Sequence, residues 1–116
     1  MLKPKVAISS DFLTAFSRIP KAQQKKVREF ITRFELDPTA SSINYERVQA
    51  RDKRVRTVRI DLNYRAIVLH PQKGDVYLLV WVDNHDEAMA WAANKVFEVN
   101  PTTGALQVID AVAVEK

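Results

Sequence analysis

The sequence of 116 residues contains no cysteine, which excludes disulfide frameworks and thiolate zinc sites and is typical of a reducing compartment. Its longest uninterrupted apolar run, residues 76–82, is far shorter than the roughly 20 residues that a membrane helix needs. The first residues also lack the apolar stretch of a secretory signal. We therefore expect a cytoplasmic chain with no membrane partner.

Glycine is nearly as scarce, with Gly74 and Gly104 as its only occurrences. A phosphate-binding P-loop and a dinucleotide fingerprint both need several glycines at fixed spacing, because the backbone must approach the phosphates closely. Neither motif fits this sequence. The chain therefore carries no ATPase motif, and we predict no cofactor.

Positive charge is concentrated in the first part of the chain. Residues 1–65 hold 15 lysines and arginines against 7 acidic residues, whereas residues 66–116 hold 3 against 7, for a net charge of +4. The densest basic stretch, residues 47–65, contains only Asp52 and Asp61 as acids. This asymmetry favours a polyanionic partner, with RNA or DNA first and an acidic protein second. A solvated basic face that serves solubility alone is the alternative.

Apolar spacing in the first third of the chain predicts two helices. Ser9 or Ser10 caps the first, and Pro20 ends it and opens the second, which runs to residue 36 and stops at Asp37-Pro38. This gives a helical hairpin over residues 11–36, preceded by a short strand at 5–8. The buried face of the second helix is predicted to be Val27, Phe30, Ile31 and Phe34.

The period changes to that of strands from residue 54 onward. Strands are predicted at 54–60, with a bulge between Val55 and Val58, at 64–70, and at 76–82, which is apolar throughout and so covered on both faces. A turn at 71–75, an Asn84-capped helix at 86–94 and a hairpin of 95–99 with 105–110 follow. We expect one α+β domain over residues 1–116, a twisted antiparallel sheet with the helical hairpin on one face. The hairpin is predicted to pack on Ile67, Leu69, Leu78 and Val80.

This order of elements resembles the RelE/ParE toxin superfamily. The residues that carry the resemblance are Phe12, Phe16, Ile19-Pro20-Lys21, Asp37-Pro38, residues 55–60, Asn63-Tyr64-Arg65 and residues 82–85. The resemblance covers residues 5–92 and implies the same α+β fold. The hairpin at 95–110 is extra, since toxins of this superfamily generally lack it.

A second resemblance covers the end of the chain. Residues 76–88 and 99–108 are similar to the amino-terminal region of large UvrD/Rep-type helicase-like proteins, in which a toxin-like domain precedes the ATPase. It implies a helicase domain as a carboxy-terminal partner and would account for the extra hairpin.

The toxin resemblance implies metal-independent cleavage of mRNA on the ribosome, which needs fixed cations at the phosphate and an acid/base group. Arg56, Arg59 and Arg65 match the basic positions of the family, and Lys53 and Arg54 extend the set that we predict to contact phosphate. His85 is the candidate acid or base, because histidine changes charge near neutral pH. Capping at a helix start is its alternative role. No metal ligation is predicted.

The sequence departs from the family pattern just after His85. Asp86 stands where the family has an arginine, and Ala90 or Trp91 stands at the place of a tyrosine. The interpretation from sequence is therefore a nucleic-acid-binding domain with a degenerate cleavage site. Two alternatives stay open: a stand-alone toxin that cuts mRNA on the ribosome and is held by an antitoxin, and a ParE-like topoisomerase inhibitor. Trp81 and Trp91 are predicted to pack in the core rather than to stack on bases.

Overall fold

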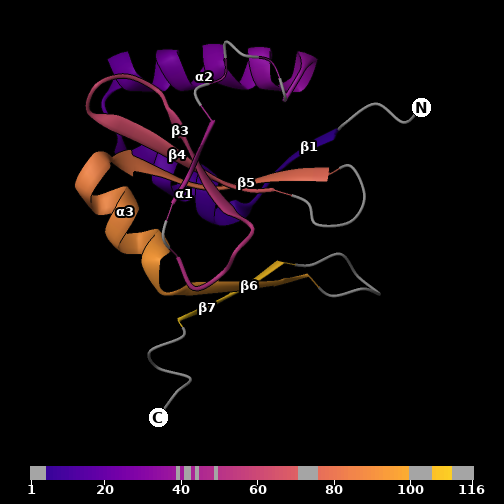
Figure 1. Ribbon diagram of the computed structural model, residues 1–116. Coiled ribbons are helices and arrows are strands. Elements are labelled where there is room, and N and C mark those ends of the chain that lie inside the picture. Colours follow the sequence, from indigo (N-terminus) through magenta and orange to yellow (C-terminus); the bar gives the residue numbers. More distant parts are fainter. Residues whose placement is uncertain are drawn as a thin grey trace.

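The computed structural model describes residues 5–38, 40, 43, 45–48, 50–70, 76–99 and 106–110. The described elements are three helices and seven strands, with α2 above the central strands and β6 and β7 below them in Figure 1. In chain order the elements are β1 (Lys5–Ile8), α1 (Ser10–Arg18), α2 (Lys21–Leu36), β2 (Tyr45–Arg47), β3 (Val55–Arg59), β4 (Tyr64–Leu69), β5 (Val76–Asn84), α3 (His85–Ala93), β6 (Lys95–Val99) and β7 (Leu106–Asp110).

The central sheet has five strands in the order β1-β5-β4-β3-β2, and β6 pairs with β7 in a separate two-stranded sheet. β2, β3, β4 and β5 form an antiparallel meander, and β1 pairs with the other edge of β5 in parallel. The predicted α+β fold is confirmed, with a mixed sheet in place of the wholly antiparallel one. The parallel pair arises because the chain crosses the sheet through α1 and α2 before it returns.

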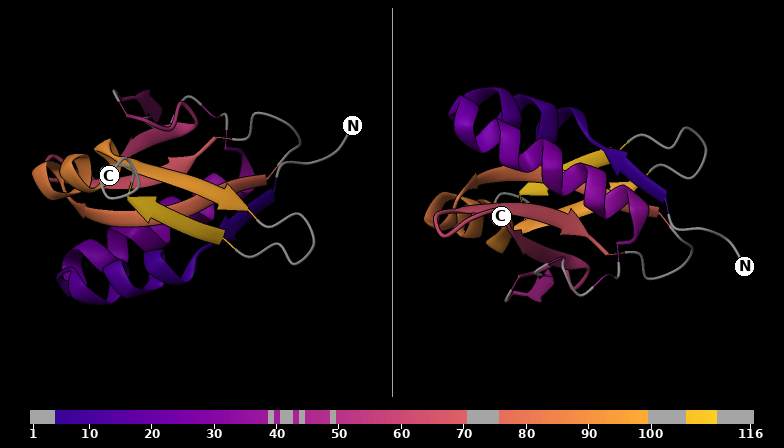
Figure 2. Two further views of the ribbon diagram at one scale, coloured as in Figure 1. Left: turned by 90° about the horizontal axis from the view of Figure 1, so that it is seen from below. Right: turned by 90° about the horizontal axis from the view of Figure 1, so that it is seen from above.

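The helical hairpin begins and ends where the sequence predicts. Ser9 is the N-cap of α1, and its hydroxyl accepts a hydrogen bond from the Phe12 amide at 3.1 Å. Pro20 precedes α2, and Asp37 ends it. Figure 2 shows the hairpin on one side of the sheet and the β6–β7 ribbon on the other. The sheet is therefore covered on both faces.

The helical hairpin packs on a different set of sheet residues from the predicted one. Its core contains Val27, Phe30 and Phe34 together with Val58, Ala66, Val68, Leu79 and Val82. The predicted partners Ile67, Leu69 and Val80 are buried on the opposite face, with Ala88, Ala92 and Phe97. The prediction was one residue out of register. Both faces of these strands are apolar, and alternation alone does not say which face receives the helices.

The β-bulge lies in β5 and not in β3, where the sequence predicted it. β3 pairs with β4 in unbroken register from Val55 to Arg59 and with β2 from Arg56 to Val58. The register shift is between β4 and β5, where Ile67 faces Trp81 and Val68 faces Leu79, so that Val80 is the extra residue. The spacing of Val55 and Val58 that suggested a bulge has another cause, because the two valines belong to cores on opposite faces of the sheet.

One strand was not predicted from the sequence, and two predicted turns are not among the described residues. β2, which pairs with β3 at the sheet edge, was not predicted from its three polar and aromatic residues. The predicted turns at 71–75 and 100–104 lie outside the described residues. The carboxy-terminal helix and hairpin are confirmed, with Asn84 capping α3 and β6 pairing with β7.

Phe97 of β6 is expected to be a main contributor to stability. Its side chain is 2% exposed and packs with Val55, Ile67 and Val80 beneath the sheet. Phe97→Ala should lower the free energy of unfolding by about 3–5 kcal/mol, the usual cost of such a core truncation. Urea denaturation measures this loss. Leu36→Ala, at a side chain that is 70% exposed, is the control and should change stability by less than about 0.5 kcal/mol. A loss below about 1 kcal/mol for Phe97→Ala would show that β6 adds little to the core.

Candidate nucleic-acid interface

Two arginines lie side by side at one end of the sheet. Arg59, the last residue of β3, is directly opposite Arg65 of β4, and Arg65 is opposite Asp83 of β5. Side-chain alternation puts all three on the face that α3 covers, because Ile67 shares that alternation with Arg65. Arg59 is exposed, whereas Arg65 is only 8% exposed. We call Arg59 and Arg65 the arginine row.

Arg65 is held by the backbone of the β3–β4 turn. Its Nη1 donates hydrogen bonds to the carbonyl oxygens of Asp61 at 2.7 Å, Tyr64 at 3.0 Å and Leu62 at 3.4 Å. Carbonyl oxygens satisfy the guanidinium donors without cancelling the positive charge. Arg65 therefore fixes the turn and keeps a positive charge beside Arg59.

The same turn is fastened to α2 through Asp61. The Asp61 carboxylate accepts hydrogen bonds from Lys26 Nζ at 3.1 Å, Gln23 Nε2 at 3.3 Å and the amides of Asn63 and Tyr64. Burial raises the pKa of the Asp61 carboxyl, but these hydrogen bonds outweigh burial and hold that pKa below its ordinary value. The turn is thus preorganised from two sides.

His85 lies next to this turn, at the first residue of α3. Its amide donates to the Asn63 carbonyl oxygen at 2.6 Å, which ties the helix start to the turn. The imidazole is half exposed, and its Nδ1 lies 3.1 Å from Oδ1 of Asp86. A carboxylate at Nδ1 favours the tautomer that leaves Nε2 to exchange protons with another molecule. Asn84, rather than His85, caps the helix.

The remaining predicted phosphate contacts lie at the other end of β3. Arg54 is bound by Asp52, with Nη2–Oδ2 and Nε–Oδ1 distances of 2.7 and 3.0 Å. Arg56 Nη1 donates to the carbonyl oxygens of Lys53 and Val55, and Lys53 itself is exposed. Along a strand that rises about 3.3 Å per residue, Arg54 is about 16 Å from Arg59.

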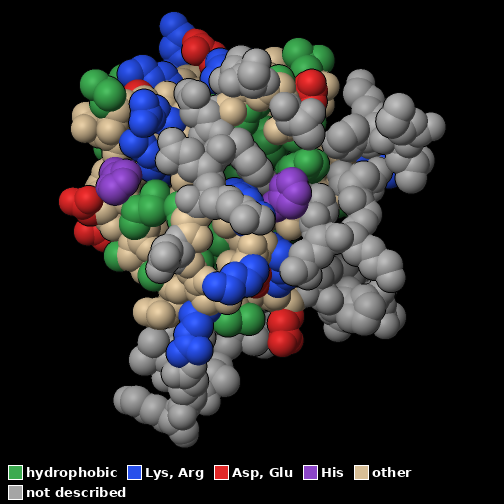
Figure 3. Space-filling model, viewed as in Figure 1, with side chains coloured by type: hydrophobic (Ala, Val, Ile, Leu, Met, Phe, Trp, Pro, Cys, Tyr) green, Lys and Arg blue, Asp and Glu red, His purple; other side chains and the backbone are tan. Residues whose placement is uncertain are grey.

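The predicted basic set is therefore divided into two places. We call the arginine row, the β3–β4 turn and His85 the turn end of the sheet, and residues 51–54 with Arg56 its loop end. Arg56 and Arg59 also face opposite sides of the sheet, because they are an odd number of residues apart. Figure 3 shows blue Lys and Arg side chains both toward the upper left and at the lower centre of the view.

The tryptophans belong to the core. The rings of Trp81 and Trp91 stack with centroids 4.7 Å apart, and Phe97 and Lys95 also contact the Trp91 ring, at 5.8 and 5.6 Å. These contacts confirm core packing. Among the described residues there is no group of three or more side chains that could hold a metal ion, and no helix long and apolar enough to cross a membrane.

Asp52 makes hydrogen bonds that the sequence did not predict. Its Oδ1 accepts from the amide and Nε of Arg54, and its Oδ2 accepts from Arg54 Nη2 and from the Phe97 amide at 3.1 Å. Arg54 also donates to the Phe97 carbonyl oxygen. The Asp52-Lys53-Arg54 sequence is compatible with a local turn of this kind, but nothing in the sequence joins it to Phe97. This network links the loop end to β6.

Several solved structures that are similar to this chain are toxins or complexes of toxins with antitoxins. A chain of the archaeal RelE–RelB complex from Pyrococcus horikoshii OT3 is 20% identical, with a TM-score of 0.56 over 72% of this chain and 96% of that one. A chain of the E. coli DinJ–YafQ toxin–antitoxin complex is 11% identical, with a TM-score of 0.60 over 74% and 97%. The YoeB/ParE toxin from Agrobacterium tumefaciens is 14% identical, with a TM-score of 0.55 over 70% and 98%.

The fold of this chain is therefore the α+β fold of RelE/ParE toxins, as the sequence resemblance predicts. No family model and no curated protein matches the sequence. At these identities the structural match establishes the fold and leaves function to the site. The similar structures lend no support to the helicase resemblance, which stays a prediction.

Proposed function

We propose that this chain is a toxin-type RNA-binding protein that holds the phosphates of single-stranded RNA at the turn end of its sheet. The arginine row is the observation that carries the proposal. Arg59 is exposed on the rim, and the buried Arg65 behind it is bonded to carbonyl oxygens. The charge of Arg65 lies beside that of Arg59, and two neighbouring cations attract a phosphate more strongly than one.

An antitoxin protein is the partner that the fold favours. The RelE–RelB and DinJ–YafQ structures are toxin–antitoxin complexes. By analogy we propose that a protein antitoxin binds this chain and controls its access to RNA. DNA binding and inhibition of a topoisomerase remain the alternatives for the same basic surface.

Arg59→Ala is expected to weaken binding of single-stranded RNA and to flatten its salt dependence. Each phosphate contact on a single strand adds about 0.7 to the log–log slope of affinity against salt, so the slope should fall by about that amount. Fluorescence anisotropy with a labelled RNA, at several salt concentrations, measures both quantities. Arg65→Ala is unsuited to this purpose, because it would remove the side-chain hydrogen bonds that hold the turn.

The matched control is Arg28→Ala. Arg28 is an exposed arginine on α2, on the opposite side of the sheet, and its loss changes net charge by the same amount. Equal losses of affinity in the two variants would show that net charge alone is responsible and would contradict a site at the turn end.

RNA cleavage is a second candidate function, favoured by the contact between His85 and Asp86. The aspartate replaces the arginine of the family pattern, which removes one cation, but it also orients the imidazole beside the turn that Arg65 fixes. One positioned acid/base group with neighbouring cations is compatible with slow, metal-independent cleavage. His85 would take the proton of the ribose 2′-hydroxyl, whose oxygen attacks the adjacent phosphate, and the bond to the 5′-oxygen of the next nucleotide would break, with that oxygen receiving a proton.

A further inference from the structure

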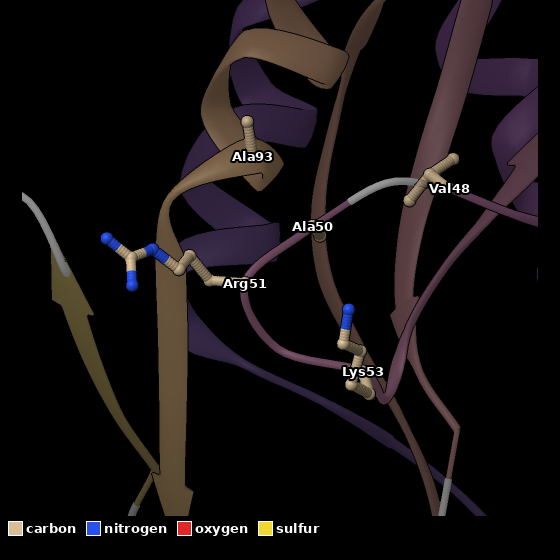
Figure 4. Close-up of a pocket in the computed structure, with 5 residues that line it drawn as sticks. All are labelled: Val48, Ala50, Arg51, Lys53 and Ala93. Carbon is tan, nitrogen blue, oxygen red and sulfur yellow. The ribbon is translucent and has the colours of Figure 1, made fainter.

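A pocket of about 490 Å³ lies at the loop end of the sheet, away from the arginine row (Figure 4). Val48, Ala50, Arg51, Lys53 and Ala93 line it. It is framed by the segment that leads from β2 to β3 and by the last residue of α3. Its size is within the range of about 300–1,000 Å³ that small-molecule sites occupy.

The walls of the pocket are held in place by contacts outside it. The Arg51 amide donates to the Ala93 carbonyl oxygen at 3.0 Å, which joins the segment to the helix end. Val48 and Ala50 pack against the core beneath α3. The Asp52–Arg54 pair fixes the next residues of the same segment to β6. A ligand would therefore meet a preformed site.

The lining combines an apolar wall with cations. Val48, Ala50 and Ala93 offer hydrocarbon surface, and Arg51 and Lys53 are the charged residues among those that line the pocket. In Figure 4 the Lys53 ammonium points into the space beside Ala50, and the Arg51 side chain extends toward β6. The nearest acid in the segment, Asp52, is already occupied by Arg54 and the Phe97 amide. This chemistry suits an anion with a flat apolar body.

We propose that the pocket binds a nucleoside monophosphate unit, with its base against Val48, Ala50 and Ala93 and its phosphate at Lys53. The inference rests on the proposed RNA binding and extends it: the nucleotide is one unit of the strand held at the turn end. Lys53 and Arg59 are six residues apart along β3 and the turn before it, at most about 20 Å, a span that several nucleotides of single-stranded RNA cover. A free nucleotide presents the same chemistry, and the experiment separates the two sources.

The first arm uses free ligands. AMP, adenosine and inorganic phosphate are titrated separately into the ¹⁵N-labelled chain, and amide shifts are followed by NMR. AMP should shift the amides of Val48, Ala50, Lys53 and Ala93 and should bind more tightly than either of the other two. Lys53→Gln should weaken AMP about fivefold, the loss expected for one partly exposed ionic contact. Ala93→Leu should place a bulky side chain at the apolar wall where the base would lie and weaken AMP binding without a change of charge.

Lys25→Gln is the matched control, because Lys25 is an exposed lysine on α2 on the other side of the sheet. It should leave AMP binding unchanged. The proposal is overturned if AMP shifts no pocket amide up to about 10 mM, if phosphate binds as well as AMP, or if Lys25→Gln and Lys53→Gln act alike.

The second arm uses RNA oligonucleotides of increasing length. Lys53→Gln and Ala93→Leu should weaken oligonucleotides long enough to reach both ends of β3, and Arg59→Ala should weaken the same oligonucleotides. If AMP binds in the pocket but neither pocket variant changes binding at any length, the pocket serves a free nucleotide and the RNA assignment is wrong. If Arg59→Ala has no effect on RNA while AMP still binds, the proposed function fails and the pocket stands.

Discussion

Asp52→Ala is expected to destabilise the protein by about 3 kcal/mol. The Asp52 carboxylate is 8% exposed as a residue and accepts four hydrogen bonds, three from Arg54 and one from the Phe97 amide. Removing one partner of a buried ion pair costs roughly 3–5 kcal/mol, because the other charge stays behind without compensation. Arg54 keeps partial access to water, which puts the loss at the lower end of this range. Urea denaturation at pH 7 measures it.

The contacts of Asp52 also predict that the free energy of unfolding depends on pH. Burial raises the pKa of the Asp52 carboxyl, but hydrogen bonds from Arg54 and Phe97 and the Arg54 charge outweigh burial and hold that pKa below its ordinary value of 3.8. A carboxyl whose pKa is lower in the folded state stabilises the protein fully above its unfolded-state pKa, and this contribution is lost as the pH falls through the folded-state pKa.

Asp52→Asn is the appropriate comparison for this pH dependence, since it keeps the shape of the side chain and removes the titration. The difference in unfolding free energy between wild type and Asp52→Asn should be constant from pH 5 to 7 and shrink below about pH 4. A difference that stays constant down to pH 2 would contradict the role of the Asp52 charge.

His85→Ala is expected to reduce RNA cleavage on translating ribosomes by about 10²–10⁴-fold, the usual contribution of a positioned acid or base. The wild-type rate itself should be low, because Asp86 replaces a cation and Ala90 or Trp91 stands where the family pattern has a tyrosine. Primer extension on ribosome-bound mRNA locates the cuts and gives their rate.

His85→Gln is the control for His85→Ala, because it keeps a polar side chain at the helix start without an acid/base group. Both variants should retain the wild-type unfolding free energy within about 0.5 kcal/mol, since the side chain is half exposed. If wild type shows no cleavage, the second candidate function is wrong and RNA binding remains. If His85→Ala cuts as fast as wild type, His85 is not the acid or base.

Much of the local structure could be predicted because it depends on neighbours in sequence. The Ser9 cap, the break at Pro20 and the Asn84 cap each follow from one or two residues and their own backbone, and all three are confirmed. The apolar run at 76–82 predicts a strand covered on both faces, and β5 contributes to both cores. These signals are short-range, so tertiary contacts did not override them.

Roles that depend on distant partners could not be predicted. The sequence groups Arg54, Arg56, Arg59 and Arg65 by charge and position alone. In the structure Arg54 is bound to Asp52 and β6, Arg65 is buried under a turn, and Arg56 and Arg59 face opposite sides. Charge in a sequence says nothing of burial, and burial decides whether an arginine holds the fold together or meets solvent.

The sequence by itself determined the helical hairpin, the strands of the meander and the resemblance to RelE/ParE toxins, because each is encoded in the spacing of apolar residues and in turn-forming ones. The tertiary structure decided which face of the sheet the helices cover, since alternation is symmetric when both faces are apolar. It also decided that β6 contributes to the core. Phe97 is buried beneath the sheet and bonded to Asp52, 45 residues earlier, a contact that only folding creates.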